Sequence, residues 1–198
     1  MQKTFLRKIE NLYKKSDQLL ATGKFGEGLW PLHAVTGEFL FYLIRFFKLR
    51  KGIEVGAGVG YSSAWFAAAL KETRGHLLSF EYYLPKVKQW EVHMKNLFGQ
   101  NFLDFVTMVP SEFEKSMGHL KRNRGFFDFV FFDQRKEDYF SHLKLLLPSL
   151  QKGCFIAADN VISHQGFCQE YLEFVKTDLR FMSVTLPIGQ GLEISRVL

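Results

Sequence analysis

Three oxygen-bearing side chains follow two short apolar runs in the second half of the chain. Asp133 comes directly after the run 127–132, and Asp159 and Asn160 follow the run 154–158. If both runs are neighbouring parallel strands, these side chains meet beyond one edge of a sheet, where open α/β folds bind ligands. Carboxylate and amide oxygens suit a hard octahedral cation such as Mg²⁺. The alternative is an Asx turn at Asp159, which leaves Asp133 unexplained.

A glycine-rich run follows the first apolar segment of the predicted sheet. Residues 54–62 read EVGAGVGYS, and glycines let a backbone turn tightly and approach a ligand closely. The spacing is G-x-G-x-G, whereas a dinucleotide-binding loop has G-x-G-x-x-G. The acid at Glu54 favours a ligand with an amino-acid end, because its carboxylate can hold an ammonium group while the Ser62 hydroxyl holds a carboxylate. A plain strand-to-helix turn is the alternative.

Glu81 comes directly after a second apolar run, at 76–80. A carboxylate accepts two hydrogen bonds at once, which suits the two hydroxyls of a ribose. Several nucleotide cofactors carry a ribose, so Glu81 indicates a nucleoside without saying which one. A merely solvated glutamate is the alternative.

The elements that must position these residues alternate along the chain. Apolar runs predict strands at 52–55, 76–80, 105–109, 127–132 and 154–158. Amphipathic stretches predict helices at 62–71, 85–98, 112–120 and 139–150. Strict alternation favours a parallel sheet that is covered on both faces.

The two ends of the chain differ from this pattern. Helices are expected at 4–21 and at about 35–47, with a glycine-rich break at 23–28 between them. After a helix near 165–176, a glycine turn at 189–191 joins the runs 181–186 and 192–197 into a hairpin, so the sheet ends in an antiparallel strand. We treat 1–198 as a single domain, with an N-terminal helical cap at 1–48 and a Rossmann-like core at 50–198.

The composition fits this view. The chain has 198 residues, 47% of them apolar, which is enough for one domain with a full-sized core. No apolar run reaches the roughly 20 residues that span a bilayer. The N-terminus is basic but lacks the apolar core of a signal peptide, so we expect a cytoplasmic protein without a membrane partner.

Together the motifs resemble the class I, metal-dependent O-methyltransferases of the catechol and caffeoyl-coenzyme A type, including their small bacterial members. The matching stretches follow the family order and are 54–62, Glu81, 127–139, 158–161 and 187–192. The resemblance implies an α/β, Rossmann-like methyltransferase fold. Its sheet would have seven mostly parallel strands with an antiparallel C-terminal strand, helices on both faces and two N-terminal helices.

The resemblance also implies a role for each residue of the site. S-adenosylmethionine would be bound by Glu54, Gly56, Gly58, Tyr61, Ser62, Glu81, Ser111, Glu112 and Asp133, with the adenine near Ser111 and Glu112. Mg²⁺ or another divalent cation would be bound by Asp133, Asp159 and Asn160. Lys136 would be the general base that takes the proton from a hydroxyl of a small, catechol-like acceptor.

Three departures from the family pattern bear on the ligands. The sequence PSEF at 110–113 replaces the small-residue run usual near the adenine. The segment after Asn160 is short, which predicts an open acceptor site. Gln134 and Arg135 replace small or aromatic residues, and the charge of Arg135 could suit an anionic acceptor.

Other functions and partners stay open at this point. The net charge is +6, with basic groups at 14–15, 45–51 and 121–124, which fits a solvated surface or RNA. Some bacterial members of the family methylate a hydroxylated uridine in transfer RNA. A non-catalytic S-adenosylmethionine-binding module would not need Lys136 and the cation ligands, and an NAD-dependent oxidoreductase would not need the cation.

An apolar stripe on the two N-terminal helices predicts a contact surface. It includes Leu12, Leu19 and Phe39. In the family such helices help to form a homodimer. The alternative is that they simply cover the sheet.

Overall fold

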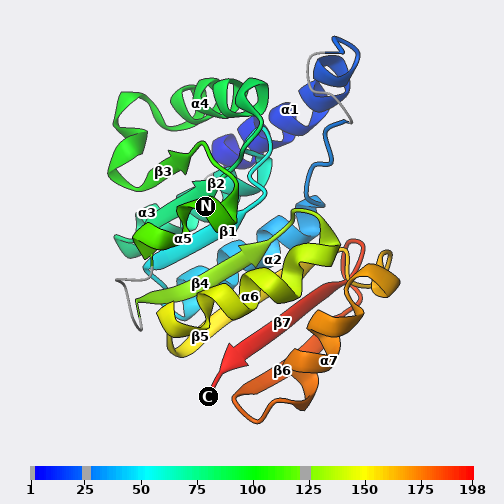
Figure 1. Cartoon of the computed structure of the whole chain (residues 1–198). Helices are drawn as coiled ribbons and strands as arrows, with labels where there is room; N and C mark the ends of the chain where they lie inside the picture. Colours follow the sequence, from blue (N-terminus) through cyan, green and yellow to red (C-terminus); the bar gives the residue numbers. More distant parts are fainter. Residues whose placement is uncertain (1–2, 24–27, 121–125) are drawn as a thin grey trace.

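The computed structural model describes residues 3–23, 28–120 and 126–198, and within these residues one seven-stranded sheet runs through the molecule (Figure 1). The strands are β1 (Lys51–Val55), β2 (His76–Phe80), β3 (Val106–Val109), β4 (Phe127–Phe132), β5 (Leu150–Asp159), β6 (Phe181–Leu186) and β7 (Leu192–Val197). The helices are α1 (Lys3–Leu20), α2 (Ala34–Phe46), α3 (Tyr61–Thr73), α4 (Leu84–Phe98), α5 (Phe113–Leu120), α6 (Tyr139–Leu146) and α7 (Gln169–Thr177).

The strand order is β3-β2-β1-β4-β5-β7-β6, and β7 is antiparallel to both of its neighbours. Every residue of β4 is buried, which is typical of a central strand in a parallel sheet. The register pairs Val55 with Phe80 and with Phe132, and Phe132 with Ala158. The carboxyl ends of β1, β2, β4 and β5 therefore align along one edge, which we call the carboxyl edge. This architecture confirms the predicted fold class.

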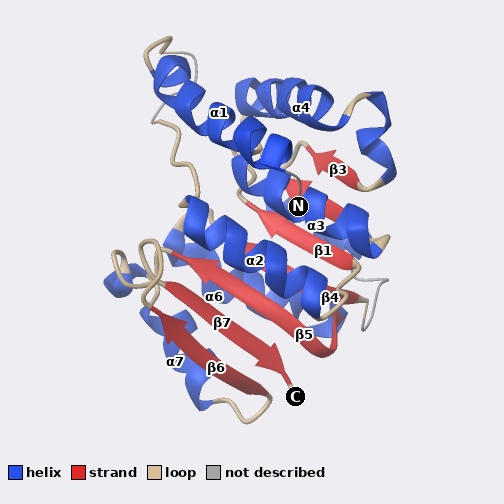
Figure 2. Cartoon of the chain, turned by 180° about the vertical axis from the view of Figure 1, so that it is seen from behind, coloured by secondary structure: helices blue, strands red, loops and turns tan. Residues whose placement is uncertain are grey.

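Helices cover both faces of the sheet. Helices α5, α6 and α7 lie in front of the sheet in Figure 1, and α1 and α2 lie in front of it when seen from behind in Figure 2. One apolar core packs α1 to α4 against the sheet, and a second core packs α5 to α7 against the other face. Across the described residues, no helix combines the length and the apolar character needed to cross a bilayer.

Two predicted boundaries were wrong. The helix expected at 139–150 ends at Leu146, and a 3-10 turn containing Pro148 follows it, because proline has no N–H for the helix ladder. Strand β5 therefore begins at Leu150, which pairs with Phe127. The helix expected near 165–176 starts later, since residues 165–167 form a 3-10 turn before α7.

The apolar stripe of the N-terminal helices faces inward. Leu12 and Phe39 pack, partly buried, against the core of α1 to α4, and Leu19 packs beside Val59. Within one chain these side chains therefore help to cover the core, as the alternative expectation had it, and each of them stays partly exposed. A homodimer stays a prediction. Residues 24–27 of the expected glycine-rich break lie outside the described residues.

Candidate active site

The glycine loop between β1 and α3 is fixed to the ends of two other strands. The N–H groups of Gly56 and Ala57 both donate to the Phe80 carbonyl at 3.0 Å. Gly56 has φ of 95°, and a Cβ there would lie 2.4 Å from the main-chain oxygen of Asp133. Gly60 has φ of 96°, and its Cβ would lie 2.7 Å from the Trp90 ring. Glycine is required at both positions, and the loop packs closely on the end of β4.

Glu54 lies behind this loop rather than in it. The residue is fully buried, and its carboxylate accepts hydrogen bonds from the hydroxyls of Ser62 (2.5 Å), Ser63 (2.5 Å) and Ser79 (2.7 Å). Burial raises the pKa of Glu54, and the three hydroxyl donors oppose that rise. The Ser62 hydroxyl is directed at Glu54, so the two residues predicted to hold the amino-acid end of a ligand contact each other. Their contacts with a ligand stay predictions.

Sequence reasoning missed Ser63 and Ser79. A signal for Ser79 existed, because it is a polar residue inside an apolar strand and its register partner on β1 is Glu54. Ser63 also accepts a hydrogen bond from the Trp90 indole at 2.8 Å, which links α4 to the same cluster.

Glu81 at the end of β2 does meet the glycine loop. Its Oε2 atom accepts a hydrogen bond from the N–H of Gly58 at 3.0 Å, and its Oε1 accepts one from the N–H of Tyr83 at 2.9 Å. Each carboxylate oxygen can accept a second hydrogen bond. Glu81 is thus placed beside the loop where a ribose would be expected.

The carboxyl ends of β4 and β5 bring the predicted acids and Lys136 together. Lys136 Nζ lies 2.8 Å from Asp133 Oδ1, and the two side chains are only 15% and 14% exposed. The Asp133 N–H donates to the Val55 carbonyl at 3.0 Å, which ties it to the end of β1. On the next strand, Asp159 is 2% exposed, and the Tyr139 hydroxyl donates to its main-chain oxygen at 3.0 Å.

The surroundings of the Asp133 and Asp159 carboxyl groups disfavour their negatively charged forms. The Asp159 Oδ1 atom is buried without a hydrogen-bond partner. Burial, and then the charge of Asp133, raise the pKa of Asp159 to about 7, although the Asn160 N–H and Lys136 oppose the shift. Burial also raises the pKa of Asp133, against the opposing effect of Lys136. A buried carboxylate oxygen without a donor, next to a second carboxylate, fits a divalent cation well.

The remaining predicted ligand residues have local partners. Ser111 donates to the main-chain oxygen of Glu112 at 3.0 Å, and Glu112 forms an ion pair with Lys115 at 2.8 Å. Tyr61 is buried, with its ring centroid 5.5 Å from that of Tyr13 on α1. Their contacts with a cofactor stay predictions. Arg135 is bound by Asp138 at 2.8 Å, so its charge is already paired.

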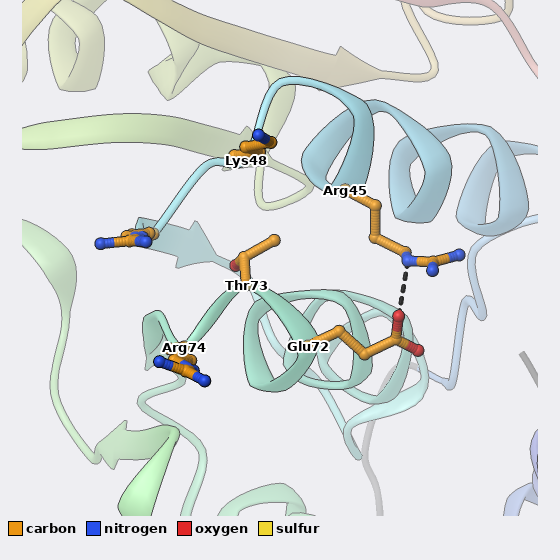
Figure 3. Close-up of a pocket in the computed structure, with 6 residues that line it drawn as sticks. Arg45, Lys48, Glu72, Thr73 and Arg74 are labelled. Atoms are coloured by element: carbon orange, nitrogen blue, oxygen red, sulfur yellow. Dashed lines mark ion pairs between the residues drawn. The ribbon is translucent and has the colours of Figure 1, made fainter.

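A basic hollow lies at the opposite edge of the sheet, where α2 and α3 end (Figure 3). It has a volume of about 310 Å³ and is lined by Arg45, Lys48, Arg50, Glu72, Thr73 and Arg74. Arg45 pairs with Glu72 at 2.6 Å, while Arg74 points away from Arg45 (Figure 3). The basic group predicted at 45–51 thus lies away from the carboxyl edge, and the group at 121–124 falls outside the described residues.

Comparison with known proteins identifies the family of this chain. Residues 53–161 match a protein family described as a methyltransferase domain. The chain is 26% identical to a caffeoyl-CoA O-methyltransferase of Medicago sativa, over 88% of this chain and 78% of that protein. It is 29% identical to a catechol O-methyltransferase of Niastella koreensis, over 76% of this chain and 68% of that protein.

Solved structures share the fold. An O-methyltransferase of Streptomyces achromogenes in complex with S-adenosylmethionine superposes with a TM-score of 0.80, at 20% identity, over 100% of this chain and 91% of that chain. An O-methyltransferase of Bacillus cereus in complex with S-adenosylhomocysteine gives a TM-score of 0.78, at 19% identity, over 100% and 92% of the two chains.

Proposed function

The chain belongs to the methyltransferase domain family, as a class I S-adenosylmethionine-dependent O-methyltransferase of the catechol and caffeoyl-coenzyme A type. From that premise, we propose that it methylates one of two neighbouring hydroxyls on a small acceptor, assisted by a divalent cation. Two neighbouring hydroxyls would offer the cation two oxygen ligands at once. Such an acceptor would supply two of the three positions that Asp133, Asp159 and Asn160 leave open in a six-ligand shell, with water as the third.

One observation carries the proposal. The Oδ1 atom of Asp159 is buried without a donor, next to the ion pair of Asp133 and Lys136. A site that only binds S-adenosylmethionine would not need a second buried acid there. Asp133, Asp159 and Asn160 would hold the cation, and Mg²⁺ suits their oxygen atoms.

Each part of the site would have its own role in the reaction. When bound, the cation supplies positive charge that favours a deprotonated hydroxyl. Once its own proton has been lost to solvent, Lys136 would receive the hydroxyl proton at Nζ. The hydroxyl oxygen then attacks the methyl carbon in line, so that an O–C bond forms while the S–C bond breaks. Glu81 and the glycine loop would fix the donor, and this positioning supplies a large part of the rate.

Methyl transfer to catechol and to caffeoyl-coenzyme A, with phenol as a single-hydroxyl control, tests the proposal. We expect transfer to a dihydroxy acceptor, with loss of activity in EDTA and recovery on adding Mg²⁺. Asp133→Ala and Asp159→Ala should lose the same activity. Full activity in EDTA, or in both variants, would rule out the cation route.

A calorimetric titration separates the alternatives. S-adenosylmethionine should bind to the wild-type protein, whereas NAD should not. Binding of S-adenosylmethionine without transfer to any hydroxylated acceptor would favour a non-catalytic binding module.

A further inference from the structure

The turn between β6 and β7 is joined to the segment that follows β5. The N–H of Val161 donates to the carbonyl of Gly191 at 3.0 Å, and the N–H groups of Ile162 and Ser163 donate to the carbonyl of Gln190 at 3.2 and 3.1 Å. The β5–β7 ladder pairs Asp159 with Leu192 directly beside these bonds. The antiparallel strand therefore places Gln190 against Asn160, although the two residues are 30 positions apart in the chain.

The side chains of these two residues are also in contact. The Nδ2 atom of Asn160 donates to Gln190 Oε1 at 3.2 Å, and the Ser163 hydroxyl donates to the same oxygen at 2.9 Å. Asn160 has φ of 64°, a left-handed conformation that asparagine tolerates better than most residues. Its main-chain oxygen accepts a hydrogen bond from the N–H of His164 at 2.9 Å. The backbone and the side chain of Asn160 are thus both held from outside.

An asparagine amide offers two different atoms to its surroundings. Only Oδ1 can bind a cation, whereas Nδ2 is a donor that would repel it. Rotation about the last side-chain bond exchanges the two atoms at little cost unless a partner selects one orientation. An acceptor that engages Nδ2 leaves Oδ1 as the ligand atom.

We propose that Gln190 is a positioning residue for the cation site, because its Oε1 atom holds Asn160 Nδ2 and so presents Asn160 Oδ1 to the cation. This inference rests on the proposed cation dependence of the function. Residues that orient metal ligands in this way contribute strongly to affinity, and their substitution weakens metal binding by about 10- to 100-fold.

Two substitutions of Gln190 distinguish the effect of its hydrogen bond from the effect of its side-chain size. Gln190→Met keeps the length of the side chain but removes the acceptor. Gln190→Glu keeps an acceptor and cannot donate, so it supports only the orientation with Oδ1 free. Neither change touches the main-chain carbonyl that holds Ile162 and Ser163.

The test is calorimetric titration of the whole protein with Mg²⁺ and with Mn²⁺ in the presence of S-adenosylhomocysteine. We expect the metal Kd of Gln190→Met to rise about 10- to 100-fold, and that of Gln190→Glu to match the wild type or fall. The Kd of S-adenosylhomocysteine should not change. In an Asn160→Ala background, Gln190→Met should have no further effect, because the two residues act as one unit.

Two results would overturn the assignment. One is a Gln190→Met protein that binds both metals like the wild type, and the other is an equal loss of affinity in the Asn160→Ala background. Absence of metal binding by the wild type is a different result, which would overturn the proposed cation site itself.

Discussion

The Nδ1 atom of His93 on α4 lies 2.7 Å from the carbonyl oxygen of Val59 in the glycine loop. A carbonyl oxygen can only accept, so Nδ1 carries the proton, and in a neutral ring Nε2 accepts from the Gln89 amide at 2.7 Å. His93 is only 5% exposed. Helix α4 therefore holds the loop at Val59 through His93, and packs against Gly60 through Trp90.

His93 should make stability depend on pH. Burial lowers its pKa, the Val59 carbonyl opposes this, and the charge of Lys15 on α1 adds to it. The unfolded chain therefore takes up a proton near pH 6.5, before the folded protein does. This contribution to stability is complete above about pH 6.5 and is lost as the pH falls below that value. Urea unfolding from pH 8 to pH 5 should show a smaller loss of stability in His93→Gln than in the wild type.

The exposed His33 offers the matched control. His33→Gln makes the same change of side chain on the surface and should keep the wild-type stability at pH 8. An identical pH dependence in His93→Gln and in the wild type would show that His93 does not become protonated more readily on unfolding.

Gly56 should tolerate no side chain. A Cβ at this position lies 2.4 Å from the main-chain oxygen of Asp133, and φ is 95°. Gly56→Ala should cost about 1–3 kcal/mol from backbone strain alone and should weaken S-adenosylmethionine binding. At Gly166 no atom lies within 4 Å of an added Cβ, so Gly166→Ala should leave both quantities unchanged. Thermal unfolding and calorimetric titration measure the two effects.

Much of the fold could be predicted because its signals are local in the sequence. In the described part of the structure, the alternation of apolar runs and amphipathic stretches identified five of the seven strands, and the glycine turn at 189–191 identified the other two. Parallel strands then place their carboxyl ends together, which is why Asp133 and Asp159 could be assigned to one site. The end of α6 was misplaced because apolar residues continue past Pro148 into β5.

The supporting contacts could not be predicted, since they depend on three-dimensional packing. His93 and Val59 are 34 positions apart, and Asn160 and Gln190 are 30 apart, with no spacing rule that joins either pair. Glu54 shows the same limit. Its acidic character predicted a ligand contact, but its hydrogen bonds to three serines depend on which side of β1 it occupies, which the sequence does not specify.

Asp159 should weaken the fold in the absence of a cation. Its carboxyl ionises near pH 7 in the folded protein and near pH 4 in the unfolded chain. The folded state therefore binds more protons between these values, and stability falls as the pH rises through this range. Asp159→Asn removes the effect and should stabilise the cation-free protein at pH 8, by at most about 4 kcal/mol. Thermal unfolding in EDTA checks this.

Mg²⁺ should stabilise the wild type but not Asp159→Asn, because a ligand stabilises only a protein that binds it. We expect Mg²⁺ to raise the Tm of the wild type and not that of Asp159→Asn.

Asp178→Asn is a control in which the stability should change in the opposite direction. Arg180 lowers the pKa of Asp178 to about 2, so its charged form supports the fold and its loss should lower stability at pH 8. An Asp159→Asn protein less stable than the wild type in EDTA would contradict the prediction.

Lys136 should be needed for proton transfer rather than for binding. Lys136→Met should lower kcat by about 100- to 10,000-fold, the usual contribution of a general base. The Kd of S-adenosylmethionine should not change, and metal affinity should stay equal or increase, because a positive charge 2.8 Å from Asp133 is removed. Lys136→Arg keeps the charge but cannot give up its proton at neutral pH, so it should be as inactive as Lys136→Met.

The neighbouring helix provides the control for this experiment. Lys144 on α6 is exposed and lies over the Phe140 ring at 4.0 Å, so Lys144→Met should keep the wild-type kcat. An active Lys136→Arg enzyme would show that the charge of Lys136 matters and its proton does not. In that case the hydroxyl would lose its proton to solvent, and the rate should rise with pH in the Lys136→Met variant as well as in the wild type.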